Sequence, residues 1–218
     1  MTEAEFESGG VERSSSRRDP KTVTLVPLPQ CSTEQQMLVR DIRNHPSVRN
    51  SMYSAHEIGA DEHLRWVESL GTDKKKRVFA ALNENRVPVG VVYLYELDFV
   101  HKKTDWGFYL DVNQRGGLGA SLEYCMIEYA FDFLGLEKLN CEVIESNESV
   151  VKLHKKFGFS QEGFRRHNIE RAGKRMGVHF LGLTRQEWLA GKGAIQDRYG
   201  SSITKYVIVF EDKDYRLT

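Results

Sequence analysis

The sequence predicts an α/β fold with one principal domain, and three observations lead to this class. Strand-like and helix-like segments follow one another in the order β-α-α-β-β-β-α-β-α-β-β between residues 22 and 190. A chain of 218 residues, 40% of them apolar, is large enough for one domain with a substantial core. A glycine-rich turn at residues 114–120 joins a strand-like segment to an apolar helical one. A sheet covered by helices is therefore expected within residues 22–190.

The expected strands are runs of β-branched and aromatic residues bounded by turns. Residues 1–21, which precede the first, are rich in Ser, Glu, Arg and Gly and are expected to form a disordered arm. Turns at residues 83–86 and 171–174 join two pairs of strands. The strands are expected at residues 22–28, 77–82, 89–96, 104–112, 138–144, 164–170 and 174–183.

The expected helices are indicated by capping and breaking residues. Ser32 is expected to cap the first helix, which Pro46 breaks. Asp61 is expected to cap the second, which ends at Gly71. The apolar stripe of this second helix consists of Leu64, Val67 and Leu70. Two later helices are expected at residues 118–133 and at residues 150–157, the last with Asn147 as its cap.

Residues 191–218 are expected to be an appendage to this domain. Their clearest element is the strand-like run Tyr206–Phe210. This run could add an edge strand, contact a partner or stay loose, and a shared sheet edge would allow a homodimer.

Composition and charge argue against several classes of protein. The chain has 31 basic and 31 acidic residues, so it has no basic excess with which to bind nucleic acid. No apolar run approaches the roughly 20 residues of a membrane span, and the start of the chain lacks the pattern of a signal peptide. Cys31, Cys125 and Cys141 have no disulfide or zinc spacing. A cytoplasmic protein without a metal is therefore expected.

The glycine-rich turn is the first indication of chemistry. A turn that opens a helix presents backbone N–H groups at the positive end of the helix dipole, which suits a pyrophosphate. Gly117 and Gly119 would let an anion approach the backbone where a Cβ would obstruct it. A plain strand-to-helix turn is the alternative. The pattern Q/R-x-x-G-x-G/A resembles the acetyl-coenzyme A loop of the GCN5-related N-acetyltransferases, and the order of elements is similar to theirs.

This resemblance implies a mixed, mostly antiparallel sheet of about seven strands that splays apart at the cofactor site. It also implies acetyl-CoA as the co-substrate, with its pyrophosphate on the loop and its pantetheine arm along the end of the preceding strand. The residues expected to bind the cofactor are Leu110, Val112, Gln114, Arg115, Gly116, Gly117, Leu118, Gly119, Ala120 and Asn147.

A second set of motifs is more specific. Residues 41–46 read D-I-R-N-H-P, residues 48–54 read V-R-N-S-M-Y-S, and residues 62–66 read E-H-L-R-W. They resemble the acceptor half of the bacterial nucleotide-sugar N-acetyltransferases of the pseudaminic acid pathway. The resemblance implies acetyl transfer to the 4-amino group of UDP-4-amino-4,6-dideoxy-N-acetyl-β-L-altrosamine, a step towards a nonulosonic acid used in flagellin glycosylation.

Two residues are candidates for proton transfer. Glu142 interrupts an apolar strand, and burial there would make its carboxylate a stronger base, suited to accept a proton from the attacking amine. A structural carboxylate bonded to a neighbouring strand is the alternative. His154 stands where many members of the superfamily have the tyrosine of L-Y-x-x-x-G-F, which protonates the leaving thiolate. Its helical spacing with Val150 and Phe157 directs it inward, so it is either this acid or a packed core histidine.

The candidate acceptor residues lie in the first half of the chain. Arg43, Asn44 and His45 precede a proline that fixes their direction, and a guanidinium suits a phosphate or a uracil edge. A helix-ending turn with a salt bridge would also explain them. The remaining candidates are Met52 and Tyr53, at the sugar, and His63, expected on a different helix side from Leu64, Val67 and Leu70.

Two other functions remain open. The first is a protein or ribosomal N-terminal acetyltransferase, which would share the cofactor loop but use a peptide groove. The second is a non-catalytic acetyl-CoA-binding module, which the replacement of tyrosine by His154 and the C-terminal segment would allow.

Overall fold

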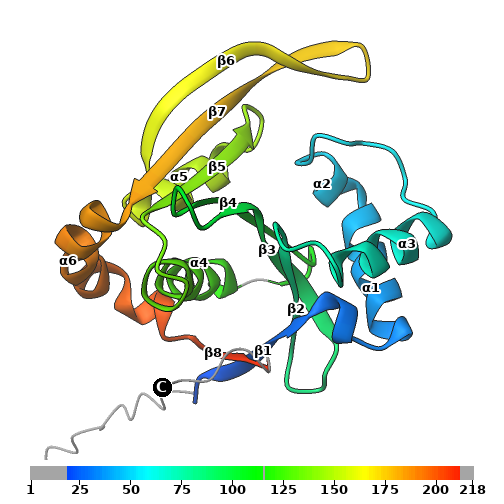
Figure 1. Ribbon diagram of the computed structural model, residues 1–218, viewed down its shortest axis with the longest axis horizontal. Helices are drawn as coiled ribbons and strands as arrows, with labels where there is room; N and C mark the ends of the chain where they lie inside the picture. Colours follow the sequence, from blue (N-terminus) through cyan, green and yellow to red (C-terminus); the bar gives the residue numbers. More distant parts are fainter. Residues whose placement is uncertain (1–18, 115, 212–218) are drawn as a thin grey trace, which may run out of the picture.

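An eight-stranded mixed sheet forms the centre of the fold, and helices cover both of its faces (Figure 1). The computed structural model describes residues 19–114 and 116–211. The strand order is β6-β7-β5-β4-β3-β2-β1-β8, with β1–β8 and β4–β5 as parallel pairs and the other neighbours antiparallel. The strands are β1 (Lys21–Pro27), β2 (Arg77–Leu82), β3 (Pro88–Asp98), β4 (Lys103–Leu110), β5 (Lys138–Ile144), β6 (Ser160–Arg171), β7 (Lys174–Thr184) and β8 (Tyr206–Phe210). The mixed, mostly antiparallel sheet is confirmed, with one strand more than expected.

The helices cover both faces of the sheet, and each strand directs alternate residues towards the helices on one face and those on the other. They are α1 (Thr33–Asn44), α2 (Pro46–Arg49), α3 (Ala60–Leu70), α4 (Leu118–Glu128), α5 (Glu148–Lys156) and α6 (Arg185–Ile203), with a 3-10 turn η1 (Leu28–Gln30) and a π turn η2 (Tyr129–Phe133). In β2, Val78 and Ala80 belong to the core under α1 and α3, whereas Phe79 and Ala81 belong to the core under α4, α5 and α6.

The helices of the first half differ from expectation in their ends. Ser32 caps α1 as expected, through a capping box with Gln35. Pro46 ends α1 but also begins the short helix α2, since proline is well suited to a first helical position. The expectation that Asp61 caps α3 is wrong. Gly59 is the cap, and its N–H donates to the carboxylate of Glu62 at 3.4 Å.

Helix α6 is the main element that the sequence pattern does not predict. It contains three glycines and buries only Trp188 and Ile195, so it has no continuous apolar stripe. The sequence feature that could have indicated α6 is the capping box of Thr184 and Glu187, which are three residues apart. α6 crosses residue 190, where the appendage was expected to begin, and packs against α4. The strand expected at Tyr206–Phe210 is confirmed as β8, the edge strand beside β1.

The sheet opens between β4 and β5. These strands pair only from Lys103 to Asp105 and from Lys138 to Asn140. Beyond that point β4 continues beside β3, and β5 continues beside β7. The expected splay is therefore present, and it gives a ligand access to the backbone of both strands. Within the described residues, no helix is long and apolar enough to cross a membrane.

Candidate active site

Two cavities meet where β4 and β5 separate. The larger, of about 630 Å³, lies between the helices α1 and α3, the loop after α2, and the strands β3 to β5. The smaller, of about 260 Å³, lies between β4, β5 and the first turn of α5. The residues that line both cavities are Ser51, Met52, Tyr93, Trp106, Tyr109 and Glu142. A ligand in one cavity could therefore react with a ligand in the other at this shared wall.

The glycine-rich turn has the backbone that an anion site requires. Gly116 and Gly117 both have φ of +102°, a conformation that L-residues with a side chain rarely adopt. Gly117 is the N-cap of α4, and no side chain from the described residues caps that end. Gln114 lies in the turn before it, Gly119 and Ala120 lie in the first turn of α4, and Leu118 is buried in the core. Arg115 lies outside the described residues.

Substitution of Gly117 by Ala should weaken acetyl-CoA binding by about tenfold, because a Cβ at positive φ costs on the order of 1–2 kcal/mol, and relaxation of the turn would move its N–H groups away from the positions that the anion requires. The new Cβ would also stand 3.2 Å from Cδ of Lys205. Isothermal titration with CoA measures the change. Gly173→Ala is the matched control, since φ there is +75° but no heavy atom lies within 4 Å, and Gly173 lies between β6 and β7 rather than in the turn before α4. Equal CoA affinity in both variants would contradict a role for the turn.

The residues expected along the pantetheine arm lie at the smaller cavity. Leu110 ends β4, and Val112 lies in the following turn rather than in the strand where it was expected. Both line the smaller cavity with Asn147. Asn147 occupies the N-cap position of α5, but its side chain makes no cap bond and accepts instead from the Ser149 hydroxyl at 3.1 Å. Its amide N–H groups therefore remain available to a ligand in this cavity.

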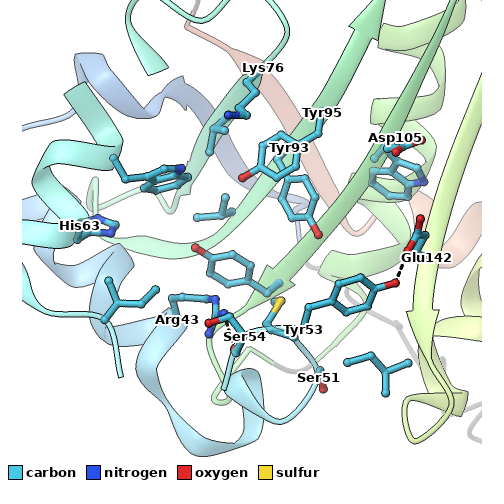
Figure 2. Close-up of a pocket in the computed structure, with 18 of the residues that line it drawn as sticks. Arg43, Ser51, Tyr53, Ser54, His63, Lys76, Tyr93, Tyr95, Asp105 and Glu142 are labelled. Atoms are coloured by element: carbon cyan, nitrogen blue, oxygen red, sulfur yellow. Dashed lines mark hydrogen bonds between the residues drawn. The ribbon is translucent and has the colours of Figure 1, made fainter. Parts of the chain in front are cut away.

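Glu142 is exposed, and the expectation that it is buried is wrong. The alternating strand β5 directs Leu139, Cys141 and Val143 into the core and Glu142 towards the opposite side, where the sheet has opened. The hydroxyl of Tyr53 donates to its carboxylate across the cavity (Figure 2). Burial, reinforced by this carboxylate, raises the pKa of Tyr53, so the phenol stays a donor. Tyr53 therefore orients Glu142 at the shared wall.

His154 is buried, at 2% exposure, which confirms its inward direction. Its Nδ1 lies 2.6 Å from Oε1 of Glu123 on α4, which is fully buried. Burial alone would lower the pKa of His154, but Glu123 and Cys141 more than offset it and raise the pKa from 6.5 to about 10. His154 and Cys141 both line the smaller cavity. The imidazole therefore lies at the smaller cavity with a raised pKa.

The expected cluster of Arg43, Asn44 and His45 does not converge. Arg43 lines the larger cavity, where its Nη2 donates to the Ser54 carbonyl at 2.9 Å. Its Nη1 is buried without a partner among the described residues. Asn44 is occupied by two hydrogen bonds to the backbone of Ile58, and His45 is exposed and caps α2. The chain turns between the helices, so three consecutive side chains point in three directions, and only Arg43 reaches the cavity.

Arg171 fixes the loop that presents Met52 and Tyr53. It lies at the end of β6, in the hairpin that arches over the molecule towards α2 (Figure 1). Its guanidinium donates to the carbonyls of Arg49, Asn50 and Met52 at 2.6–2.9 Å. Met52 and Tyr53 both line the larger cavity, as expected for acceptor residues. The hairpin thereby holds one wall of that cavity in place.

Replacing Arg171 by Ala should raise KM for the acceptor roughly tenfold to 100-fold, since small displacements of a substrate-positioning loop have effects of this size. KM for acetyl-CoA should not change. Initial rates at varied concentrations of each substrate separate the two effects. Arg175→Ala is the control, because Arg175 lies in the same hairpin but pairs with exposed Glu170. A parallel rise in both KM values would contradict a role confined to the acceptor loop, whereas a lower kcat with unchanged KM values would indicate a loss of folded enzyme.

His63 lies on the buried stripe of α3 with Val67 and Leu70, so the expectation that it faces another side is wrong. It packs against Trp66 with ring centroids 5.4 Å apart, and burial lowers its pKa. Both rings line the larger cavity. His63 is therefore a neutral wall residue whose Nε2 is buried without a partner among the described residues.

The sequence reasoning missed an aromatic wall on the sheet. Tyr93 and Tyr95 of β3 are stacked with centroids 4.6 Å apart, and both line the larger cavity with Tyr109 of β4 (Figure 2). Lys76 also lines it. The signal was the spacing of Tyr93 and Tyr95, which places two aromatic side chains on one face of a strand. The sequence reasoning also missed Glu123 and Arg171, because their partners lie far away in the chain.

The sheet opens between β4 and β5, and the two cavities that meet there could hold two ligands side by side. Residues 38–179 match the acetyltransferase (GNAT) domain family. The chain belongs to this family and is an acetyl-CoA-dependent N-acetyltransferase. Within the described residues, no group of three or more His, Cys, Asp or Glu side chains could hold a metal ion.

The chain resembles several acetyltransferases at modest identity. It is 28% identical over 134 residues, 60% of this chain and 80% of the relative, to acetyltransferase PseH of Campylobacter jejuni. It is 26% identical over 92 residues, 42% of this chain and 53% of the relative, to spermidine N(1)-acetyltransferase of Vibrio cholerae. The crystal structure of spermidine N-acetyltransferase from Vibrio cholerae in complex with CoA and spermine aligns with a TM-score of 0.69 at 19% identity, covering 77% of this chain and 98% of that one. This last likeness concerns the fold alone.

Proposed function

We propose that the enzyme acetylates the 4-amino group of a UDP-linked 4-amino-4,6-dideoxy sugar, as in pseudaminic acid biosynthesis. The similarity to PseH over 60% of this chain supports this assignment. The observation that carries it is the wall of the larger cavity, where stacked tyrosines stand near two cations, Arg43 and Lys76. Aromatic faces suit a uracil or a sugar ring, and a guanidinium suits a diphosphate.

The position of these groups fits the length of a nucleotide sugar. Arg43, Trp66 and Lys76 line only the larger cavity, whereas Glu142 lies at the wall shared with the cofactor cavity. A sugar amine at Glu142 would thus place the diphosphate and uracil towards Arg43 and Trp66. Arg43 Nη1 and Trp106 Nε1 are buried N–H donors without partners in the described part of the chain, and His63 Nε2 is likewise unpartnered, which leaves polar groups for a polar acceptor.

The proposed reaction is direct. The sugar amine loses a proton to Glu142 and attacks the thioester carbonyl, forming the C–N bond. The C–S bond breaks, and His154 gives a proton to the departing CoA thiolate. In the free enzyme the carboxylate of Glu142 accepts from Tyr53, which leaves its second oxygen for the amine.

A polyamine is the second candidate acceptor. Glu62, Glu96, Asp105 and Glu142 line the same cavity, and carboxylates suit a polycation. Spermidine acetyltransferases are among the relatives. Arg43 and Lys76 in the same wall would repel such a ligand, so the nucleotide sugar is preferred.

Binding of UDP separates the two candidates without requiring turnover. Calorimetric titration should show UDP binding to the wild-type enzyme and at least tenfold weaker binding to Arg43→Gln, with spermidine failing to compete. Arg40→Gln is the control, because Arg40 lies on the same helix but outside both cavities. Spermidine binding that excludes UDP would overturn the assignment in favour of a polyamine.

A further inference from the structure

A carboxylate lies completely buried behind the cofactor cleft. Glu123 of α4 has no exposed surface, and its Oε1 lies 2.6 Å from Nδ1 of His154. Its Oε2 is buried and has no hydrogen-bond partner in the described part of the chain. Leaving a carboxylate oxygen unpaired in a core destabilises the fold, and an apolar residue would pack there at no such cost. The single bond to His154 is therefore the evident reason for a carboxylate at this position.

Two aromatic rings and two titratable groups surround the imidazole. Trp106 and Phe159 flank the ring, with centroids 5.4 and 5.1 Å away. The titratable groups facing it are Glu123 from α4 and Cys141 from β5, whose thiol also has a hydrogen-bond contact with the ring; Asp105 of β4 acts on Cys141 rather than on the ring. Since Nδ1 is held by Glu123, Nε2 is the nitrogen left for the smaller cavity, which His154 lines.

We infer that Glu123 is a positioning residue, whose carboxylate holds Nδ1 of His154 so that a protonated Nε2 faces the sulfur of acetyl-CoA. This inference rests on the acid role of His154 in the proposed function. In the step concerned, the C–S bond breaks and its electron pair goes to sulfur. The proton on Nε2 then moves to that sulfur, which gives CoA thiol and a neutral imidazole still bonded to Glu123.

The pKa shifts of Glu123 and His154 are consistent with the short contact between them. Burial raises the pKa of Glu123, and the imidazole lowers it in part, whereas the pKa of His154 rises to about 10. Without the carboxylate, the pKa of His154 would lose its largest raising contribution while burial would still lower it, so the pKa would fall. The acid must be protonated to act, so the rate falls as pH rises through the pKa of His154. Glu123 thereby keeps the acid protonated throughout the neutral range.

The test is Glu123→Gln, which keeps the shape and a hydrogen-bonding group but removes the charge. We expect kcat at pH 8 to fall by at least about tenfold, since loss of the carboxylate lowers the pKa of His154 and with it the fraction of the acid that is protonated there. KM for acetyl-CoA should stay within about twofold of wild type. The alkaline limb of the kcat profile should move from near pH 10 to a lower pH. Nitrogen-15 shifts of the His154 ring, measured without substrates, should show the same change in its titration.

Two further variants distinguish a positioning role of Glu123 from a purely structural one. Glu128→Gln alters another carboxylate of α4 that hydrogen-bonds Trp188 and Lys192 away from the cleft, and its pH profile should match wild type. Glu123→Asp should recover part of the alkaline limb by restoring the charge. If Glu123→Gln leaves both the ring titration and kcat unchanged, the pair is only structural and the inference fails. If the ring titration changes but the wild-type enzyme does not acetylate the sugar, the proposed function fails and the positioning stands.

Discussion

Glu142→Gln is expected to lower kcat by about 10²–10⁴-fold, the range for removing a general base. Glu142 lies on the wall shared by the cofactor and acceptor cavities, so it is the carboxylate that an amine attacking the thioester would meet. Glutamine keeps the size of the side chain and can still accept from the Tyr53 hydroxyl, but it does not take up a proton at neutral pH. Release of CoA thiol under saturating acetyl-CoA and acceptor measures the effect.

The carboxylate of Glu96 provides a matched control for Glu142. It lines the larger cavity but not the cofactor cavity. Glu96→Gln should leave kcat within about threefold of wild type, because a group outside the shared wall does not reach the reacting amine. Equal losses of kcat in the two variants would show that the charge of the cavity matters, and that no single base acts.

His154→Ala is expected to lower kcat at least tenfold, with little change in acetyl-CoA affinity, through loss of the proton donor. The change also leaves Glu123 unpaired in the core, and breaking a buried pair costs about 3–5 kcal/mol. His154→Gln should retain a hydrogen bond to Glu123 and therefore most of the stability, but not the activity. Thermal unfolding and calorimetric titration with CoA separate these effects.

The exposed neighbour Lys155 gives the comparison for His154, because it lies on the same helix and faces away from the core. Lys155→Ala should have wild-type kcat and melting temperature. A His154→Gln enzyme that is folded and fully active would contradict the acid role and leave the histidine as a packing residue.

Local signals in the sequence were sufficient for most of the fold. The strands β2 and β5 and the strand β8 begin and end where composition and turns indicated, and the capping box at Ser32 was found. Helix α6 was not predicted, because it contains glycines and lacks an apolar stripe, so its sequence shows no helical periodicity. Its stability comes from packing on α4 and from the hydroxyl of Ser121, which donates to carbonyls at the end of α6. Contacts of this kind are distant in the chain and leave no local pattern.

The candidate site was also predicted only in part from local sequence. The glycine turn and the inward direction of His154 followed from local spacing, and the structure agrees on both. Glu142 was expected to be buried because its neighbours are apolar, but the separation of β4 from β5 exposes that side of the strand. Burial on a strand depends on what covers each face, and the sequence of one strand does not contain that information.

Acetylation of UDP-4-amino-4,6-dideoxy-N-acetyl-β-L-altrosamine is the measurement that tests the central claim most directly. The purified enzyme is incubated with acetyl-CoA and this sugar, and the product is examined by mass spectrometry and by NMR at C4. The account predicts one added acetyl group on the 4-amino nitrogen, with kcat/KM at least 100-fold above that for spermidine, on the order of a charge-mismatch penalty of about 3 kcal/mol. Acetylation of spermidine at the higher kcat/KM, or an unmodified sugar with active enzyme, would contradict it.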